Sequence, residues 1–291
     1  MAGTGRYWLE WSEGASSGST IAYLSWQTWQ VSEGQLRVVD DASPGEWIAP
    51  RLGGAFGAVT RTVPSGYSAY ARVCHPASDS NGDAASWPEV AEATGRIAHP
   101  LMQWHALVGS SDPFNFRGSL WPGGDPARGD LAPEPLEVLC DILATHTADA
   151  DDCYVAFWVG WAWVYGGGEL IKPVGPGSEL ERTPIPAAFS ADEMTRSRLV
   201  HPDDREYVML TVPLSAVRHL SDSGVGESSP NLLWPADRAW CVTSEIDFDS
   251  TLVGGSSDLV QAVLDAPGLD SWPVSPEDSL AADADKINRV L

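Results

Sequence analysis

Basic side chains are scarce in this sequence. Its 291 residues contain 17 Lys and Arg against 40 Asp and Glu, a formal net charge of −23 at pH 7. Sequence-independent binding to nucleic acid needs basic groups that displace phosphate counterions, and docking on an anionic membrane needs them as well. We therefore expect no direct nucleic-acid binding and no membrane association. Hydrophobic residues still make up 43% of the chain, so its charge does not predict disorder.

Long apolar runs and closely spaced cysteines are also absent. No run of about 18 apolar residues is present to cross a bilayer, and the first residues lack the apolar segment of a secretion signal. Cysteine is rare, no Cys-x-x-Cys pair occurs, and the cysteines lie far apart in apolar segments, at Cys74, Cys140, Cys153 and Cys241. These features favour a cytoplasmic protein with reduced, buried thiols, and a disulfide pair is the alternative.

Familiar cofactor and metal motifs are missing. The sequence has no Gly-Lys-Ser or Gly-Lys-Thr phosphate loop and no Gly-x-Gly-x-x-Gly fingerprint. The spacing of His99 and His105 fits neither His-Glu-x-x-His nor a zinc finger. His201-Pro-Asp-Asp204 could supply a general base, although this composition is more typical of a turn. We expect no cofactor and no metal, and the sequence favours a non-enzymatic role without deciding the question.

Tryptophan, in contrast, is abundant, with 14 residues. Such large rings are costly to expose, so most of them should fill the core, while a few could form a stacking platform. Segments with strand and helix patterns alternate without a βαβ rhythm. This arrangement predicts an α+β fold: a largely antiparallel or mixed sheet, several packed helices and a Trp-rich core. We expect one compact unit over residues 1–291, with two lobes (1–108 and 134–291) joined by the Gly- and Pro-rich loop 109–133 as the alternative.

Five segments carry specific expectations. A capping box, Ser86-Trp-Pro-Glu89, predicts a helix over 87–94, and an apolar stripe predicts a second helix over 134–146. Residues 153–165 carry no charge, which predicts a strand in the interior of the sheet. Residues 240–249 alternate like a strand, and a helix is expected from Ser279 to the end.

Several segments together carry a resemblance to a known family: Tyr70–Pro76, His99–Trp104, His146–Cys153, Trp158–Trp161 and Leu233–Ser256. They resemble a family of uncharacterised hypothetical proteins from high-GC actinobacteria. The resemblance covers most of the chain from about residue 67, and it leaves residues 1–65 unmatched. The family has no established activity, so the resemblance implies a cytoplasmic bacterial protein with one recurring fold and no particular catalytic residue.

The best local signal for a binding site is a carboxylate triplet. If residues 240–249 form one strand, then Glu245, Asp247 and Asp249 share a face, each about 7 Å from the next. Like charges so placed repel each other, which costs little in water and is relieved by a positive partner. A solvated strand face, a basic protein partner and a divalent cation each account for the pattern, although hard cations want oxygen ligands from more than one segment.

Three functions from different classes stay open at this stage. The first is a non-catalytic acidic interaction protein, an immunity- or antidote-like partner of a basic protein. The second is a hydrolase whose carboxylate and His come together from distant segments, and the third is a DNA mimic. A deep pocket with convergent carboxylates and a perturbed His would favour the enzyme, whereas an acidic face without a pocket would favour the partner.

Overall fold

A nine-stranded sheet organises the structure, a computed structural model that describes residues 36–116, 118–166, 169–174, 179–184, 187–218, 220 and 229–290. The strands of this sheet are β1 (Arg37–Val38), β2 (Ala69–Cys74), β5 (Cys153–Trp158), β8 (Arg198–Val200), β9 (Glu206–Val212), β10 (Leu232–Pro235), β11 (Cys241–Ser244), β12 (Ser250–Gly255) and β13 (Ser271–Val274). Their order is β1-β9-β5-β10-β11-β12-β2-β13, with β8 beside β9, and every pair is antiparallel.

Helices occupy the faces and ends of this sheet. They are α1 (Val59–Thr62), α2 (Trp87–Thr94), α3 (Trp104–Leu107), α4 (Pro133–Ala144), α5 (Ala162–Tyr165), α6 (Ala191–Arg196), α7 (Leu214–Val217), α8 (Ser257–Leu264) and the 3-10 turn η1 (Ala49–Arg51). The predicted α+β class is therefore confirmed. The residues before and after the 109–133 segment build one sheet, because β2 pairs with β12 and β13.

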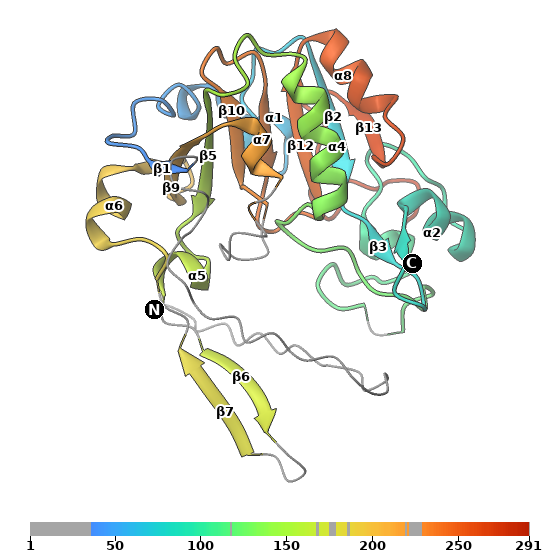
Figure 1. Cartoon of the computed structure of the whole chain (residues 1–291). Helices are drawn as coiled ribbons and strands as arrows, with labels where there is room; N and C mark the ends of the chain where they lie inside the picture. Colours follow the sequence, from blue (N-terminus) through green and yellow to red (C-terminus); the bar gives the residue numbers. More distant parts are fainter. Residues whose placement is uncertain are drawn as a thin grey trace.

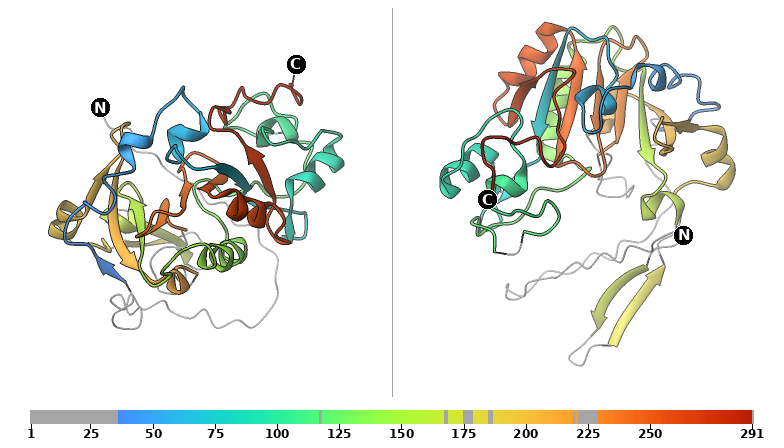
Figure 2. Two further views of the ribbon diagram at one scale, coloured as in Figure 1. Left: turned by 90° about the horizontal axis from the view of Figure 1, so that it is seen from above. Right: turned by 180° about the vertical axis from the view of Figure 1, so that it is seen from behind.

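Two short hairpins complete the described elements. One joins β3 (Ala77–Ser78) to β4 (Ala84–Ala85), and the other joins β6 (Glu169–Val174) to β7 (Glu179–Pro184). The second hairpin extends away from the body of the molecule (Figures 1 and 2).

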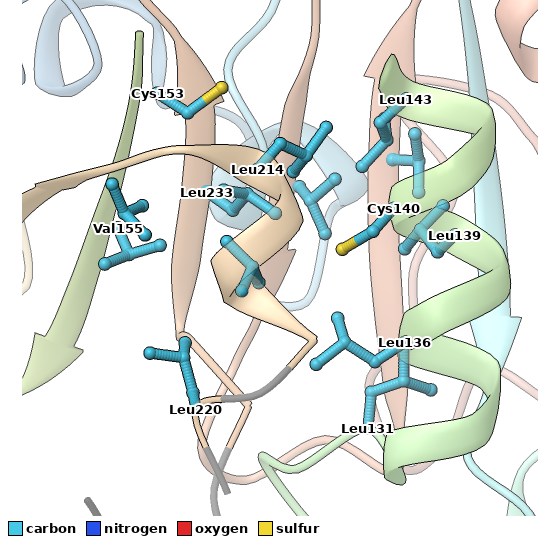
Figure 3. Close-up of a cluster of buried hydrophobic side chains, with 14 of the residues drawn as sticks. Leu131, Leu136, Leu139, Cys140, Leu143, Cys153, Val155, Leu214, Leu220 and Leu233 are labelled. Atoms are coloured by element: carbon cyan, nitrogen blue, oxygen red, sulfur yellow. The ribbon is translucent and has the colours of Figure 1, made fainter. Parts of the chain in front are cut away.

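One face of the sheet is covered by α4, α7 and α8 (Figure 1). The apolar stripe predicted for α4 is confirmed, since all four of its residues are buried and turned toward the strands and α7 (Figure 3): Leu136, Leu139, Cys140 and Leu143. Burying a side chain of this size stabilises the fold by about 1.5–3 kcal/mol. The α4 stripe thus ties this helix to the sheet.

The opposite face is covered by the chain around α1 and by the C-terminal segment, seen from behind in Figure 2. Val59, Val63 and Leu280 pack there against the strands. Tryptophan contributes to the core in part: Trp47, Trp87, Trp104, Trp234 and Trp240 are buried, while Trp121, Trp158, Trp161, Trp163 and Trp272 are partly exposed.

The segment between β2 and the 109–133 loop forms its own small core at one end of the sheet. Trp87 of α2 packs against Trp104 of α3, with ring centroids 5.5 Å apart. The predicted α2 capping box is present: the hydroxyl of Ser86 accepts from the backbone N–H of Glu89, whose carboxylate accepts from the Ser86 N–H. Gly95 ends the helix in the left-handed conformation, as its position in the sequence predicts.

The uncharged segment 153–165 is a strand only in its first half. β5 lies between β9 and β10 as predicted, but the chain turns after Trp158 and forms α5. A Cβ on Gly160 would lie 2.1 Å from the Trp158 ring, so the turn depends on that glycine. The expectation of one strand through residue 165 was wrong because alternation of apolar residues does not reveal where a chain reverses.

Two further expectations were also wrong. Residues 240–249 are not one strand: β11 ends at Ser244, a turn follows, and β12 begins at Ser250. Residues 279–290 form bends and turns rather than a helix. In that segment Asp285 and Asn288 hydrogen-bond to residues 97–103, and these tertiary contacts replace helical ones.

Candidate functional site

Arg205 gathers two of the three candidate carboxylates. It lies in the turn between β8 and β9, and its Nη1 pairs with Glu245 while its Nη2 lies 2.8 Å from Asp247 Oδ2. Asp203 Oδ2 is 3.8 Å from the Arg205 Nε. Burial raises the pKa of Glu245 above its usual value, and the neighbouring Arg205 opposes that rise. Glu245, which is largely buried, and Asp247, which is exposed, thus form one ion-pair network with Arg205.

Asp249, the third candidate, belongs to a different site. Its Oδ1 lies 3.3 Å from Nη2 of Arg72, a fully buried residue of β2. The Arg72 guanidinium also donates to Ser250 Oγ (2.9 Å) and to the Met102 carbonyl (2.7 Å), and it lies 5.0 Å from the centroid of the Trp87 ring. Nearly all donors of Arg72 are therefore used within the fold.

The prediction that Glu245, Asp247 and Asp249 project from one strand face was wrong. They lie in a turn, and two arginines from other parts of the chain neutralise them. Arg205 is about 40 residues away in sequence from the triplet, so the residues next to the triplet do not indicate this ion pair. Their role in binding a basic protein or a divalent cation stays a prediction.

A cavity of about 100 Å³ opens beside the Arg205 network. His201, from the same turn, lines it, together with Thr243 of β11 and the aromatic rings of Phe56 and Phe248. The structure thereby brings a His and carboxylates together from distant segments, and the hydrolase interpretation stays a prediction. Burial lowers the pKa of His201 to about 4, so the ring is neutral and weakly basic at pH 7.

A second polar cluster, which sequence reasoning missed, crosses the sheet at the same end. The His75 Nδ1 lies 2.7 Å from the Ala127 carbonyl, which makes Nδ1 the donor and leaves Nε2 to accept from Thr251 Oγ1 at 2.9 Å. Ser244 Oγ is 2.6 Å from the same hydroxyl. His75, Thr251 and Ser244 are at most 2% exposed, so this chain satisfies buried polar groups and offers no surface to a substrate.

Unpaired carboxylates collect at the opposite end of the sheet, where β5 and its neighbours begin or end. We call this group the acidic rim: Asp40, Asp41, Asp149, Asp151, Asp152 and Asp237, all exposed. Four of them surround Cys153. The pKa of its thiol is raised to about 12, mainly by burial and to a smaller extent by the negative charge of these carboxylates. Asp40, Asp41 and Asp152 line one depression of about 240 Å³, together with Tyr154 and Arg37.

In the described part of the chain, the carboxylates of the acidic rim form no ion pairs, although Arg37 lines the same depression. Within the described ranges, no Lys or Arg lies within ion-pair distance of any of its six carboxylates. Carboxylates elsewhere do pair, for example Glu137 and Asp141 with Arg218. The sequence signal was available in Asp149-Ala-Asp-Asp152, but Asp40, Asp41 and Asp237 reach the same place only through the fold.

Comparisons with known proteins identify no relative: the chain matches no family model, no curated protein and no solved structure. No helix among the described residues is long and apolar enough to span a bilayer. The same residues hold no group of three or more His, Cys, Asp or Glu arranged to bind a metal ion. All four cysteines are free and buried, as the sequence predicts.

Proposed function

We propose that this protein is a non-catalytic acidic interaction protein of the cytoplasm and that its acidic rim binds a basic protein, in the manner of an immunity or antidote protein. The single observation that carries this proposal is the set of six exposed carboxylates at one end of the sheet that have no arginine or lysine partner among the described residues.

The energetics favour an external counter-charge. Like charges held near each other repel, whereas carboxylates on most surfaces can lower that repulsion by pairing with neighbouring arginines, as Glu137 and Asp141 do here. A field of one sign also speeds the approach of a partner of opposite charge. The net charge of −23 strengthens the field of the rim.

The nature of the partner follows from charge and shape. A nucleic acid or an anionic membrane would be repelled by the rim, so the partner must carry basic side chains. The depression beside Asp152 and Tyr154 brings a phenol ring next to carboxylates and one arginine, Arg37. Tyrosine and arginine are frequent anchors in protein interfaces.

The proposal can be tested with two variants that have the same net charge, one of which loses carboxylates of the rim and the other of which loses carboxylates elsewhere. A rim variant carries Asp40→Asn, Asp41→Asn, Asp151→Asn and Asp152→Asn. A control variant carries four neutralised carboxylates elsewhere on the exposed surface: Glu92→Gln, Asp258→Asn, Glu277→Gln and Asp283→Asn. Both variants, tagged and expressed at equal levels in source cells, are purified together with whatever binds them and quantified by mass spectrometry.

The proposal expects a basic protein that the wild type and the control variant retain and that the rim variant loses at least about tenfold, a change of about 1.4 kcal/mol. Equal retention by the rim and control variants would contradict it. So would the recovery of acidic partners alone.

A further inference from the structure

The cavity beside Arg205 contains two buried polar atoms that lack a hydrogen-bond partner in the described structure. They are Nε2 of His201 and Oγ1 of Thr243, and both residues line the cavity. His201 is 7% exposed and Thr243 is 5% exposed. Leaving a buried polar atom unpaired costs about 1–3 kcal/mol. A fold that keeps two such atoms around one cavity is suited to a ligand that pairs with them.

The chemistry of the walls indicates a ligand that donates hydrogen bonds. His201 is neutral at pH 7, so one of its ring nitrogens carries a lone pair, and the Thr243 hydroxyl can accept as well. The charges of the walls also favour a cation. Asp203, Glu245 and Asp247 bring three negative charges to the cavity, while Arg205, which is shared among all three, and Arg61 bring two positive charges, so one negative charge is in excess.

Size and aromatic walls restrict the ligand further. The cavity of about 100 Å³ has room for about three water molecules, or for a group of a few heavy atoms. Phe56 and Phe248 line it, and Phe56 is 83% exposed, so its ring stands at the mouth rather than in the core. Aromatic faces attract cations through their quadrupole.

We propose that this cavity binds the ammonium or guanidinium group of a small organic cation. His201 Nε2 and Thr243 Oγ1 accept hydrogen bonds from the cation. Glu245 and Asp247 balance its charge, and the ring of Phe56 covers it. This site goes beyond the proposed function, because it lies at the opposite end of the sheet from the acidic rim: Tyr207 lines the cavity, and Thr211, four residues further along β9 or about 13 Å away, lines the depression of the rim.

The test is a titration of the full chain with methylguanidinium chloride and, separately, methylammonium chloride, followed by the ¹⁵N shifts of the His201 ring. Sodium chloride at equal ionic strength is the reference titration. We expect a saturable shift of Nε2 with a dissociation constant in the millimolar range for at least one of the cations, as suits a fragment of this size. No saturable shift up to 50 mM of either cation (about twelve times a 4 mM constant) would overturn the proposal, and so would an equal response to sodium chloride.

Thr243→Val keeps the shape of the side chain and removes the acceptor, so it should weaken binding of the cation about tenfold while the unliganded spectrum stays folded. Thr195→Val, on the exposed α6, is the matched control and should bind like the wild type. Unchanged binding by Thr243→Val contradicts the assignment of this acceptor and of the site. A third titration, with a capped Gly-Arg-Gly peptide, separates the sources: binding of the peptide identifies a protein side chain as the ligand, and binding of the free cations alone identifies a small molecule.

Discussion

Asp285 shows how one buried carboxylate holds a segment that has little structure of its own. Its oxygens accept from the backbone N–H groups of Gln103, Ile287 and Asn288, from the Asn288 side chain and from the His99 ring. This carboxylate therefore joins the C-terminal residues to the segment before α3. Hydrogen bonds to a charged group are worth about 1.5–3 kcal/mol each.

Asp285→Ala should lower the free energy of unfolding by about 2–4 kcal/mol, because several buried donors lose their acceptor at once. Urea denaturation monitored by tryptophan fluorescence measures the loss. Asp283→Ala is the control, since that side chain is 89% exposed, and it should change stability by less than about 0.5 kcal/mol. Equal effects of the two substitutions would show that Asp285 does not hold the segment.

Acid should also remove the stabilisation that the Asp285 carboxylate gives to the fold. Burial alone would raise the pKa of Asp285, but the hydrogen bonds from Asn288, Ile287 and His99 outweigh it and hold the pKa below its ordinary value of 3.8. A depressed folded pKa stabilises the fold above the unfolded pKa, and that stabilisation is lost as pH falls through the folded value. The wild type should therefore lose stability below about pH 4 more steeply than Asp285→Asn, as denaturation between pH 5 and pH 2 can measure. Parallel curves would contradict this.

The four thiols should be inert in the folded protein. Burial raises the pKa of each, to about 12 for Cys140, Cys153 and Cys241, so almost none is the reactive thiolate at pH 8. A disulfide-exchange reagent should label none of them within minutes in buffer and all four in denaturant. Rapid labelling of the folded chain, or fewer than four thiols in denaturant, would count against this expectation.

At the scale of single elements, β5 is an interior strand of the sheet, between β9 and β10, and most of its side chains are buried. Phe157 is fully buried between the sheet and the helical layer, where its ring lies 5.1 Å from that of Trp163. Phe157→Ala should destabilise the protein by about 3–5 kcal/mol. Phe56→Ala, at the surface, should cost less than about 1 kcal/mol. Chemical denaturation of both variants measures the two losses in the free energy of unfolding. Similar losses would show that burial of Phe157 in β5 does not stabilise the fold more than a surface ring does.

The elements that the sequence predicts well are those specified by neighbouring residues. The α2 capping box and the α4 stripe need only side chains three or four positions apart, and both helices formed as predicted. The end of β5 was missed because it depends on how Gly160 lets the chain pass the Trp158 ring. The turn between β11 and β12 was missed because its carboxylates pair with Arg205 and Arg72, which are distant in sequence.

In the candidate sites, too, only the features that depend on neighbouring residues could be predicted from the sequence. Glu245 and Asp247 were found from their spacing, but their true neighbours, His201 and Thr243, are assembled by the sheet. The acidic rim was visible only in its 149–152 part, because β1 and the end of β10 bring the remaining carboxylates to it from other parts of the chain. Carboxylates that are far apart in the sequence cannot be recognised as a cluster before the strand order of the sheet is known.

At the scale of the whole molecule, the charge should make stability depend on salt. Raising the ionic strength from 10 to 100 mM shortens the screening length from about 30 to about 10 Å. This should raise the melting temperature of the wild type, with its net charge of −23, more than that of the rim variant. Differential scanning calorimetry at the two salt concentrations compares them. An equal rise in both proteins would mean that the rim carries no special repulsion.

Photo-crosslinking in source cells can show whether the acidic rim contacts a basic protein. A photoreactive amino acid replaces Asp151 in the rim in one variant and Asp258, on the exposed face of α8, in the other. Position 151 should crosslink to one basic protein, and position 258 should not. Crosslinks to that protein from position 258 with none from position 151, or crosslinks at 151 only to acidic proteins, would contradict it.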